Sequence, residues 1–289
     1  MAVARYTLTE LSRRRILLVF LIVGAAGLLL LGGGLRLIYQ YQSSNPASLG
    51  PNSPATPADL NRLLELLFVS YLFGALGIFS EVIAFAIGMT AIYHDLDSGA
   101  AIGMFSKPVT RAAFAVGKIA AALIALVVIV GVLAVEARIV MALFGGGLED
   151  ALTGQVLAVV ANTIVVMLIV LALTTWMNNI VAAVVAFIYY NVVTTVISAL
   201  HTLTQQGVIN NDAIKFVFSV AYWIIPHELT SSAVGDLVRA EMKVSTAAGS
   251  SQALSAIPPA SGLGDIAWWA FVVVVFAGLV YYSVRRRQV

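Results

Sequence analysis

The sequence predicts an all-α integral membrane protein with six transmembrane helices. Of its 289 residues, 61% are hydrophobic and only 10% are charged, whereas an ordinary soluble domain carries about 25% charged residues. The mean hydropathy is +0.98. The apolar runs are long enough to be helices, and the short alternation of apolar and polar residues typical of an outer-membrane barrel is absent. We therefore expect a single transmembrane domain over residues 1–289.

Six segments are long and apolar enough to cross the hydrocarbon core, which takes about 20 helical residues. They are residues 16–39, 66–93, 112–135, 156–176, 181–203 and 266–284. The first follows a basic start, as a signal peptide would, but no small-residue cleavage site follows it, so we expect a retained span. A tight turn at Met177, Asn178 and Asn179 separates the fourth span from the fifth, which makes these two helices antiparallel neighbours.

The placement of basic residues predicts the orientation, because Lys and Arg collect in cytoplasmic loops. With six spans, ten of the 16 basic residues fall on one side of the membrane. These are Arg5, Arg13, Arg14, Arg15, Lys107, Arg111, Lys118, Arg285, Arg286 and Arg287. We therefore expect a multi-pass protein of the cytoplasmic (inner) membrane with both termini in the cytoplasm.

Two shorter segments are predicted to be helices that do not span the bilayer. Near the N-terminus, Ala4, Leu8 and Leu11 share one helical face, which predicts an amphipathic helix at the membrane interface. Within the outer segment 204–265, residues 213–225 form an apolar run too short for a span. The run stops at Pro226, so a re-entrant or outer helix before the sixth span fits it better.

A charged stretch with several glycines, DLDSGAAIGMFSKPVTRAAFAVGK at 95–118, lies between the second and third spans. Ser98 can cap a short, partly apolar helix that Pro108 ends, and Arg111 and Lys118 can anchor the start of the third span. A surface helix joined stiffly to two spans can act as a lever. The alternative is an ordinary connecting turn whose basic residues only set the topology.

This stretch resembles the corresponding region of ABC-2-type permeases, the membrane subunits of ATP-binding-cassette exporters. In that family an acidic pair and Ser-Gly or Gly-Thr close the second helix. A short amphipathic helix follows, then a Ser/Ala-x-Pro-[Val/Ile]-[Ser/Thr]-Arg turn, and Gly-Lys at the start of the third helix. The chain departs from the family in having Ala100 where Thr is common, and Asp where Glu is common. The matching residues are Asp95, Asp97, Ser98, Gly99, SKPVTR at 106–111, Gly117 and Lys118.

The resemblance implies that residues 98–107 form a cytoplasmic coupling helix that docks on a separate ATP-binding-cassette ATPase subunit. It also implies a second permease copy or a homologous permease as partner, and ATP and Mg²⁺ bound by the ATPase and not by this chain. The residues it assigns to ATPase coupling are Asp95, Asp97, Ser98, Gly99, Ile102, Met104, Phe105, Ser106, Lys107, Pro108 and Arg111.

The sequence contains no recognisable nucleotide-binding or catalytic motif. A phosphate-binding loop requires Gly-Lys followed by Ser or Thr, but Gly117-Lys118 is followed by Ile119. His94, His201 and His227 lack metal-ligand spacing, and the chain has no cysteine. We therefore expect no enzymatic activity, cofactor, metal or nucleic-acid partner for this chain.

Polar residues inside the predicted spans are further candidates, because a charge at the bilayer centre costs roughly 2.5–3.5 kcal/mol and needs a polar partner or water. Glu81 lies midway along the second span, where it either pairs structurally or faces a transport path. Glu136 and Arg138, near the outer end of the third span, are candidate partners for it. Asn162 and Asn191 are candidates for interhelical hydrogen bonds.

Small residues predict where the spans approach each other closely. Gly24 and Gly27 on the first span, and Gly74 and Gly77 on the second, are spaced so that each pair lies on one helical face. Such pairs let helices pack closely in a membrane. We expect them to be packing positions and not determinants of a pore.

Three functions remain open on the sequence alone. The first is the permease subunit of an ATP-binding-cassette transporter, exporting a substrate with ATP hydrolysed by its partner. The second is an ion-coupled secondary transporter or channel that uses Glu81 as a relay. The third is a membrane anchor that transmits ATPase motion to an extracytoplasmic protein, although the outer segments lack a recognisable folded domain.

Overall fold

The structure is a computed structural model that describes residues 2–13, 15–44, 57–93, 110–144, 149–205, 209, 211–231 and 261–286. The predicted coupling helix 98–107 lies outside the described residues. Of the residues assigned to ATPase coupling, Asp95 to Pro108 therefore have no structural description, whereas Arg111 does.

Every secondary-structure element of the described residues is a helix. These elements are α1 (Ala2–Arg13), α2 (Arg15–Ser44), α3 (Pro57–Ala91), α6 (Arg111–Phe144), α7 (Glu149–Thr174), α8 (Asn179–Phe187), the π-helix η2 (Ile188–Thr194), α9 (Thr195–Gln205), α10 (Asp212–Ile224) and α12 (Leu263–Arg286). α8, η2 and α9 follow one another without a break and form one rod.

Six of the described helical segments are long and apolar enough to cross a membrane. They are Leu17–Ile38, Leu72–Ala91, Arg111–Leu143, Thr153–Thr174, Asn179–Gln205 and Leu263–Arg286. Each coincides with one predicted span, so the all-helical, six-helix prediction is confirmed and the protein is a multi-pass membrane protein. The predicted turn before the fifth span is also found, since the Asn178 side chain caps α8 by accepting a hydrogen bond from the Ile180 N–H.

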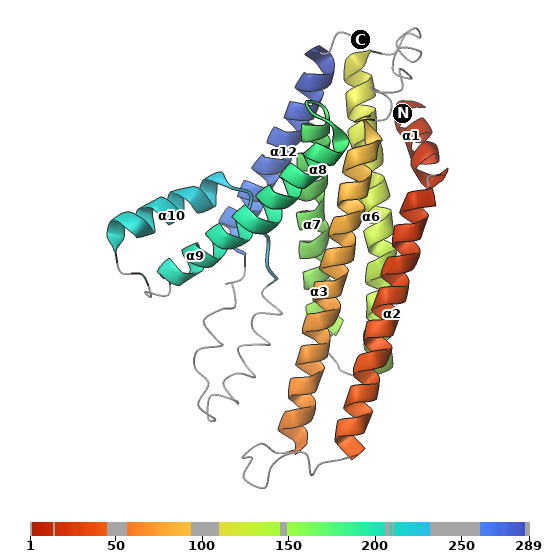
Figure 1. The fold of residues 1–289 in the computed structure, drawn as a ribbon, viewed down its shortest axis with the longest axis vertical. Helices are drawn as coiled ribbons and strands as arrows, with labels where there is room; N and C mark the ends of the chain where they lie inside the picture. Colours follow the sequence, from red (N-terminus) through yellow and green to blue (C-terminus); the bar gives the residue numbers. More distant parts are fainter. Residues whose placement is uncertain are drawn as a thin grey trace.

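The helix α7 lies at the centre of the bundle. Residues 165–172 are all buried, as expected for a helix that is apolar on every side. It packs against α3, α6, α8 and α12. Figure 1 shows the long helices side by side, with both termini at the same end of the bundle.

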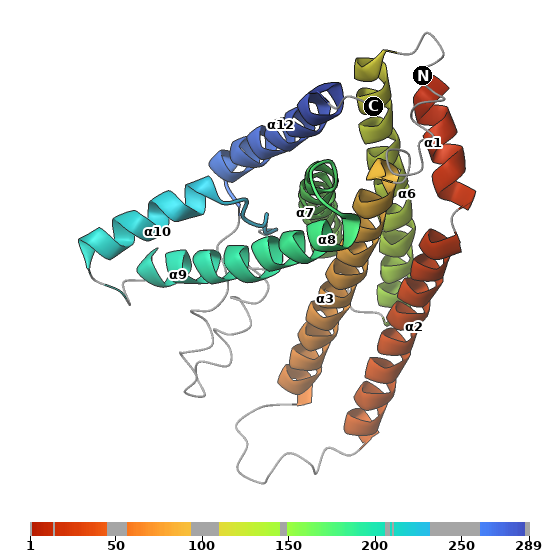
Figure 2. The same cartoon turned by 45° about the horizontal axis from the view of Figure 1, so that its top comes forward.

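The rod α8–η2–α9 and the helix α10 leave this bundle sideways. Figure 2 shows α10 lying alongside α9 and pointing back toward α12. The α8–η2–α9 rod has a largely uncovered apolar face, to which Val184, Ile188 and Val192 belong. In a membrane protein such a face contacts lipid or another chain.

Two indole groups connect α12 to α7 and to the turn after it. The Trp269 indole N–H donates to the carbonyl of Ala161 at 2.8 Å. Toward the other end of α12, the Trp176 indole N–H donates to the Ser283 hydroxyl at 2.9 Å. Although half of the α12 residues are exposed, these contacts hold the helix to the centre of the bundle at both ends.

The first helix is confirmed, and its face with Val3, Thr7 and Glu10 contacts the bundle. This face lies one residue earlier than the Ala4–Leu8–Leu11 face, which was predicted to lie on the membrane interface. The reason lies on α6. Gly117 leaves room for the Val3 side chain, because a Cβ atom at position 117 would lie only 2.9 Å from the Val3 Cβ. Lys118 then attracts Glu10.

The predicted membrane anchor Lys118 is buried in the structure. Its side chain is 1% exposed, and its Nζ lies 3.4 Å from Glu10 Oε2. A buried charge of this kind requires an opposite charge as partner. Leu8, from the predicted apolar face, instead lines an apolar groove of about 490 Å³ between α1, α2 and α6.

The glycine predictions are half correct. A Cβ at Gly27 would lie 2.5 Å from Phe79 Cζ, so α2 and α3 approach closely there. At Gly74 and Gly77, by contrast, an added Cβ would have no atom of the described residues within 4 Å beyond its own helix turn. The close contact on α3 is at Gly88, whose Cβ would lie 2.8 Å from Val170 Cβ and 3.0 Å from the Met167 carbonyl oxygen of α7.

We expect Gly88→Ala to lower the thermal unfolding midpoint of the purified protein in nanodiscs. The added methyl group meets backbone that cannot move aside, and overpacking of this kind typically costs about 1–3 kcal/mol. Gly77→Ala, on the same helix, is the matched control and should cause no loss, because its site is open and alanine favours helix. Equal midpoints for the two variants would contradict the packing seen between α3 and α7.

Candidate functional site

An extended segment, residues 225–231, connects α10 to the polar interior of the bundle. Ile225 ends α10 in an extended conformation, with φ −94° and ψ 137°. Pro226 then prevents the helix from continuing, because it lacks a backbone N–H. Pro226 and His227 are buried. The segment thus has non-helical backbone inside a bundle of apolar helices.

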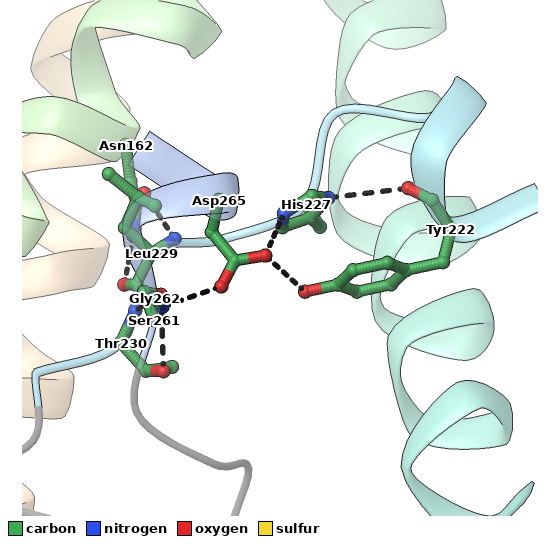
Figure 3. A network of polar contacts seen from close by, with 8 residues as sticks. All are labelled: Asn162, Tyr222, His227, Leu229, Thr230, Ser261, Gly262 and Asp265. Atoms are coloured by element: carbon green, nitrogen blue, oxygen red, sulfur yellow. Dashed lines mark hydrogen bonds and ion pairs between the residues drawn. The ribbon is translucent and has the colours of Figure 1, made fainter. Parts of the chain in front are cut away.

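Polar side chains from two of the candidate spans satisfy this backbone. The Asn162 amide of α7 makes two bonds to Leu229, donating to its carbonyl at 3.0 Å and accepting from its N–H at 2.8 Å (Figure 3). The Thr194 hydroxyl of η2 donates to the Pro226 carbonyl at 3.0 Å. Backbone groups without water need such partners, so Asn162 and Thr194 explain how the segment can lie there.

Asp265, in the first turn of α12, receives three contacts from this region. Its Oδ2 accepts the Gly262 N–H at 2.7 Å. Its Oδ1 lies 3.1 Å from His227 Nε2 and 3.5 Å from the Tyr222 hydroxyl (Figure 3). Asp265 therefore joins the end of α10, the extended segment and the start of α12.

Both ring nitrogens of His227 face acceptor atoms. Nδ1 lies 3.3 Å from the Tyr222 carbonyl oxygen, and Nε2 faces the Asp265 carboxylate. A carbonyl oxygen can only accept, so the first contact places a proton on Nδ1. The second contact holds one proton between Nε2 and the Asp265 carboxyl group.

Aromatic rings enclose the contact between His227 and Asp265. Tyr222 is stacked between His201 and His227, with ring centroids 4.3 Å and 3.9 Å from its own. The Trp223 ring meets His227 edge-on at 5.7 Å. Burial, and then the nearby charge of Asp265, raises the pKa of the Tyr222 hydroxyl, which therefore stays a donor at physiological pH.

A second polar group lies where α3 meets the π-helix. The Asn191 amide of η2 donates to the Glu81 carboxylate of α3. Tyr190, the preceding residue, is buried, and its hydroxyl has no hydrogen-bond partner among the described residues. Single π turns inside helices occur frequently at functional sites, so this contact is a candidate site in its own right.

Glu228 belongs to the 225–231 segment and is exposed as a whole residue. The protein atoms packed around its carboxyl group, followed by the charge of Glu81, nevertheless raise its pKa above the ordinary value of 4.5.

The structure brings only some of the predicted site residues together. Glu81 and Asn191 form an interhelical hydrogen bond, whereas Asn162 bonds to the Leu229 backbone and not to another helix. Glu136 is half-buried on α6 and Arg138 is exposed there; neither contacts Glu81. Arg111 has a different contact, which is described below with the proposed function.

Sequence reasoning missed four members of the two polar groups: Tyr222, His227, Glu228 and Asp265. For His227, the sequence analysis established only that it lacks metal-ligand spacing. The available signal was the run YWIIPHEL at 222–229, where a proline precedes adjacent ionisable residues at the end of an apolar helix. The sequence contains no comparable signal that Asp265 would be the partner, because 38 positions separate it from His227.

No protein-family model matches the chain, and a search of curated proteins found no match. Six helices of sufficient length and apolarity identify a multi-pass membrane protein. Any more specific function must therefore be proposed from the sequence pattern and from the geometry of the polar groups.

We expect Asp265→Ala to lower the unfolding midpoint more than Asp265→Asn. Alanine leaves the Gly262 N–H, the His227 ring and the Tyr222 hydroxyl without this acceptor, and unsatisfied buried polar groups typically cost about 1–3 kcal/mol each. Asparagine can still accept from Gly262 and donate to a neutral His227 ring. Thermal unfolding in nanodiscs measures both variants, and equal losses would show that the Asp265 contacts contribute nothing specific.

Glu228→Gln should stabilise the protein at about pH 8, with an effect that disappears on acidification. Because the folded-state pKa is raised, folding is penalised where Glu228 is ionised in both states, and the penalty vanishes below the unfolded pKa. The midpoint difference between the variant and the wild type should therefore shrink as pH falls through the raised pKa toward 4.5. A difference independent of pH would rule out ionisation as its cause.

Proposed function

We propose that this chain is the membrane-spanning permease subunit of an ATP-binding-cassette transporter. It would export its substrate across the cytoplasmic membrane using ATP hydrolysed by a separate ATPase subunit, and it would work together with a second permease copy or a homologue. The proposal depends mainly on the pattern at 95–118, and the arrangement of the helices supports it.

The supporting observation is that α3 ends and α6 begins at the end of the bundle that also carries α1 and the end of α12. The Arg111 guanidinium, at the start of α6, donates to the Arg285 carbonyl near the end of α12 at 3.4 Å. Figure 1 shows α1, the start of α6 and the end of α12 at this one end. Because basic residues collect here, it is the side we assign to the cytoplasm and to the ATPase.

The geometry suggests how motion at residues 98–107 would reach the polar groups. Closure of two ATPase domains would displace this segment and, with it, the ends of α3 and α6 to which it is joined. α3 carries Glu81, which is bonded to Asn191 of the α8–η2–α9 rod. A shift of α3 would therefore act on the rod and change the exposure of the groups beside it. ATP must favour one of these two arrangements for transport to occur.

The segment after the fifth span fits a re-entrant hairpin on the outer side. α10 runs beside α9, and residues 225–231 then return to the interior, where Asn162 and Thr194 hold them. In the proposed orientation this hairpin enters the membrane from outside and leaves by the same side. It would form the outer boundary of a path between two protomers.

The Glu81–Asn191 contact also favours a second candidate, an ion-coupled secondary transporter or channel. That function predicts transport driven by an ion gradient in vesicles that contain this chain alone. The permease proposal predicts transport only when an ATPase subunit and ATP are present. The third candidate, an anchor for an extracytoplasmic partner, would show ATPase association without any transport.

The decisive experiment is purification of the tagged chain from its native cells, with the co-purifying proteins identified by mass spectrometry. We expect an ATPase subunit with a phosphate-binding loop, and we expect the double variant Met104→Glu, Phe105→Glu to lose it. Acidic side chains there would remove the apolar surface of the coupling helix. Ala55→Glu is the matched control and should retain the ATPase. Ala55 lies between the first two predicted spans, on the side of the membrane opposite to the predicted cytoplasmic side.

Two results would contradict the proposal. One is the absence of any such ATPase from the wild-type preparation. The other is full ATPase association and stimulation in the double variant, which would show that residues 98–107 are not the contact. Membrane insertion of the variants, checked by their yield in detergent, separates loss of the contact from loss of the protein.

A further inference from the structure

We propose that the apolar groove between α1, α2 and α6 binds an anionic phospholipid of the cytoplasmic leaflet. Part of one acyl chain would lie in the groove, and the phosphate headgroup would lie near the junction where α1 ends and α2 begins. The inference goes beyond the proposed permease function and does not rest on it, because it follows from the shape of the groove and from the charges beside it.

The lining of the groove suits a hydrocarbon chain. Its volume is about 490 Å³, within the range of roughly 300–1,000 Å³ that is usual for small-molecule sites. Of the residues that line it, only Thr9 is polar. The Thr9 hydroxyl already donates to the Arg5 carbonyl of its own helix at 2.9 Å. The groove therefore favours an apolar occupant over a polar one.

The groove opens toward the surrounding lipid. Leu18 of α2 and Val128 of α6 line it and are 54% and 58% exposed, so a lipid can enter between them from the side. Leu17, which also lines it, is only 5% exposed and closes the groove toward the bundle. Ala125 of α6 contributes a single methyl group to the lining. A larger side chain at that position would fill part of the groove.

Basic residues lie at the junction of α1 and α2, beside the groove. α1 ends at Arg13 and α2 begins at Arg15, and residues of both helices line the groove. The one carboxylate of α1, Glu10, is paired with Lys118 and so does not offset these arginines. The first turn of α2 contains no acidic residue. Clusters of basic residues on a membrane-surface helix attract anionic lipids.

The course of the groove also fits a lipid. Figure 2 shows α1 beside the first part of α6, with α2 continuing along the same helix. From Arg15 the lining follows α2 to Leu21, about 9 Å further along the helix axis. The groove would hold the carbons of the acyl chain nearest the headgroup, and the rest of the chain would lie in the bilayer. A second copy packed here about a two-fold axis would instead bring its own arginines to the same region.

The test measures the binding of two lipids to the purified chain in detergent by native mass spectrometry. Dioleoylphosphatidylglycerol is anionic, whereas dioleoylphosphatidylcholine has the same acyl chains and no net charge. We expect one saturable site with about tenfold stronger binding of phosphatidylglycerol, because only this lipid offers the arginines an uncompensated phosphate.

Removing the charge should abolish the preference between the two lipids. The double variant Arg13→Gln, Arg15→Gln should bind phosphatidylglycerol only as well as phosphatidylcholine, because the groove remains but the attraction to the phosphate is lost. The matched control is Arg285→Gln, Arg286→Gln, which removes the same charge at exposed positions near the end of α12. It should retain the preference for phosphatidylglycerol.

Filling the groove should weaken the binding of both lipids. Ala125→Leu should lower both affinities about tenfold, because the larger side chain takes the space of the acyl chain and removes apolar contact. Ala270→Leu, at an exposed position on α12, is the control and should bind both lipids like the wild type. Unfolding midpoints show whether each variant has folded. The Arg13 and Arg15 variant changes no residue that lines the groove, so it remains informative if Ala125→Leu does not fold.

Three outcomes would overturn the site. They are equal binding of the two lipids by the wild type, unchanged binding of phosphatidylglycerol in either the arginine variant or Ala125→Leu, and loss of a dimer in Ala125→Leu without a change in lipid binding. The last outcome would assign the groove to a second copy of the chain. Because the assay needs neither an ATPase nor ATP, its failure is separate from failure of the co-purification that tests the permease function.

Discussion

The backbone polar groups of the segment after α10 must be satisfied away from water, and this requirement determines how that part of the protein packs. A helix satisfies its own backbone, but the seven residues from 225 to 231 are not helical and lie against apolar spans. The Asn162 amide satisfies the backbone of Leu229, because it donates to the Leu229 carbonyl and accepts from the Leu229 N–H, as a neighbouring β-strand would. The position of Asn162 on α7 therefore sets where the segment lies, and with it where His227 and Glu228 can reach.

The two polar groups follow from this placement. Fixing Leu229 at α7 and Pro226 at η2 leaves His227 beside Asp265. The first group then ties α10 to α12 through the His227–Asp265 contact, which aromatic rings enclose. The second group joins α3 to the π-helix through the Glu81–Asn191 hydrogen bond, beside a Tyr190 hydroxyl that has no hydrogen-bond partner among the described residues.

The spans could be predicted from the sequence because their signal is local. A run of about 20 apolar residues has no other common explanation, and all six predicted runs are helices. The face of α1 could not be predicted in the same way. Its own periodicity favours Ala4, Leu8 and Leu11, but the contact face is decided by Gly117 and Lys118 on another helix. Half of the glycine predictions failed for the same reason, since Gly77 has suitable spacing but no neighbour.

The candidate site shows the same limit. Glu81 and Asn191 attract attention individually as polar residues in apolar runs, but they lie 110 positions apart and nothing in the sequence pairs them. His227, Glu228 and Asp265 lie outside the predicted spans, so no intramembrane polar residue signals them. Their role depends on the return of residues 225–231 into the bundle, which is a tertiary event. The π-helix could not be predicted from the sequence either, because IYYNVVT at 188–194 has a composition that an ordinary membrane α-helix could also have.

That π-helix controls the direction of everything that follows it. A π turn holds an extra residue compared with an α turn, and each residue of an α-helix corresponds to about 100° of rotation. Converting 188–194 to α geometry at its present length would therefore turn α9 and α10 by about that angle around the axis of α8. Deleting one residue and restoring α geometry would instead leave α9 and α10 facing nearly the same way, because the π turn already absorbs one extra residue. For the evolution of such chains, this stretch can gain or lose one residue without redirecting α10, whereas the change alters which side chain within it faces α3.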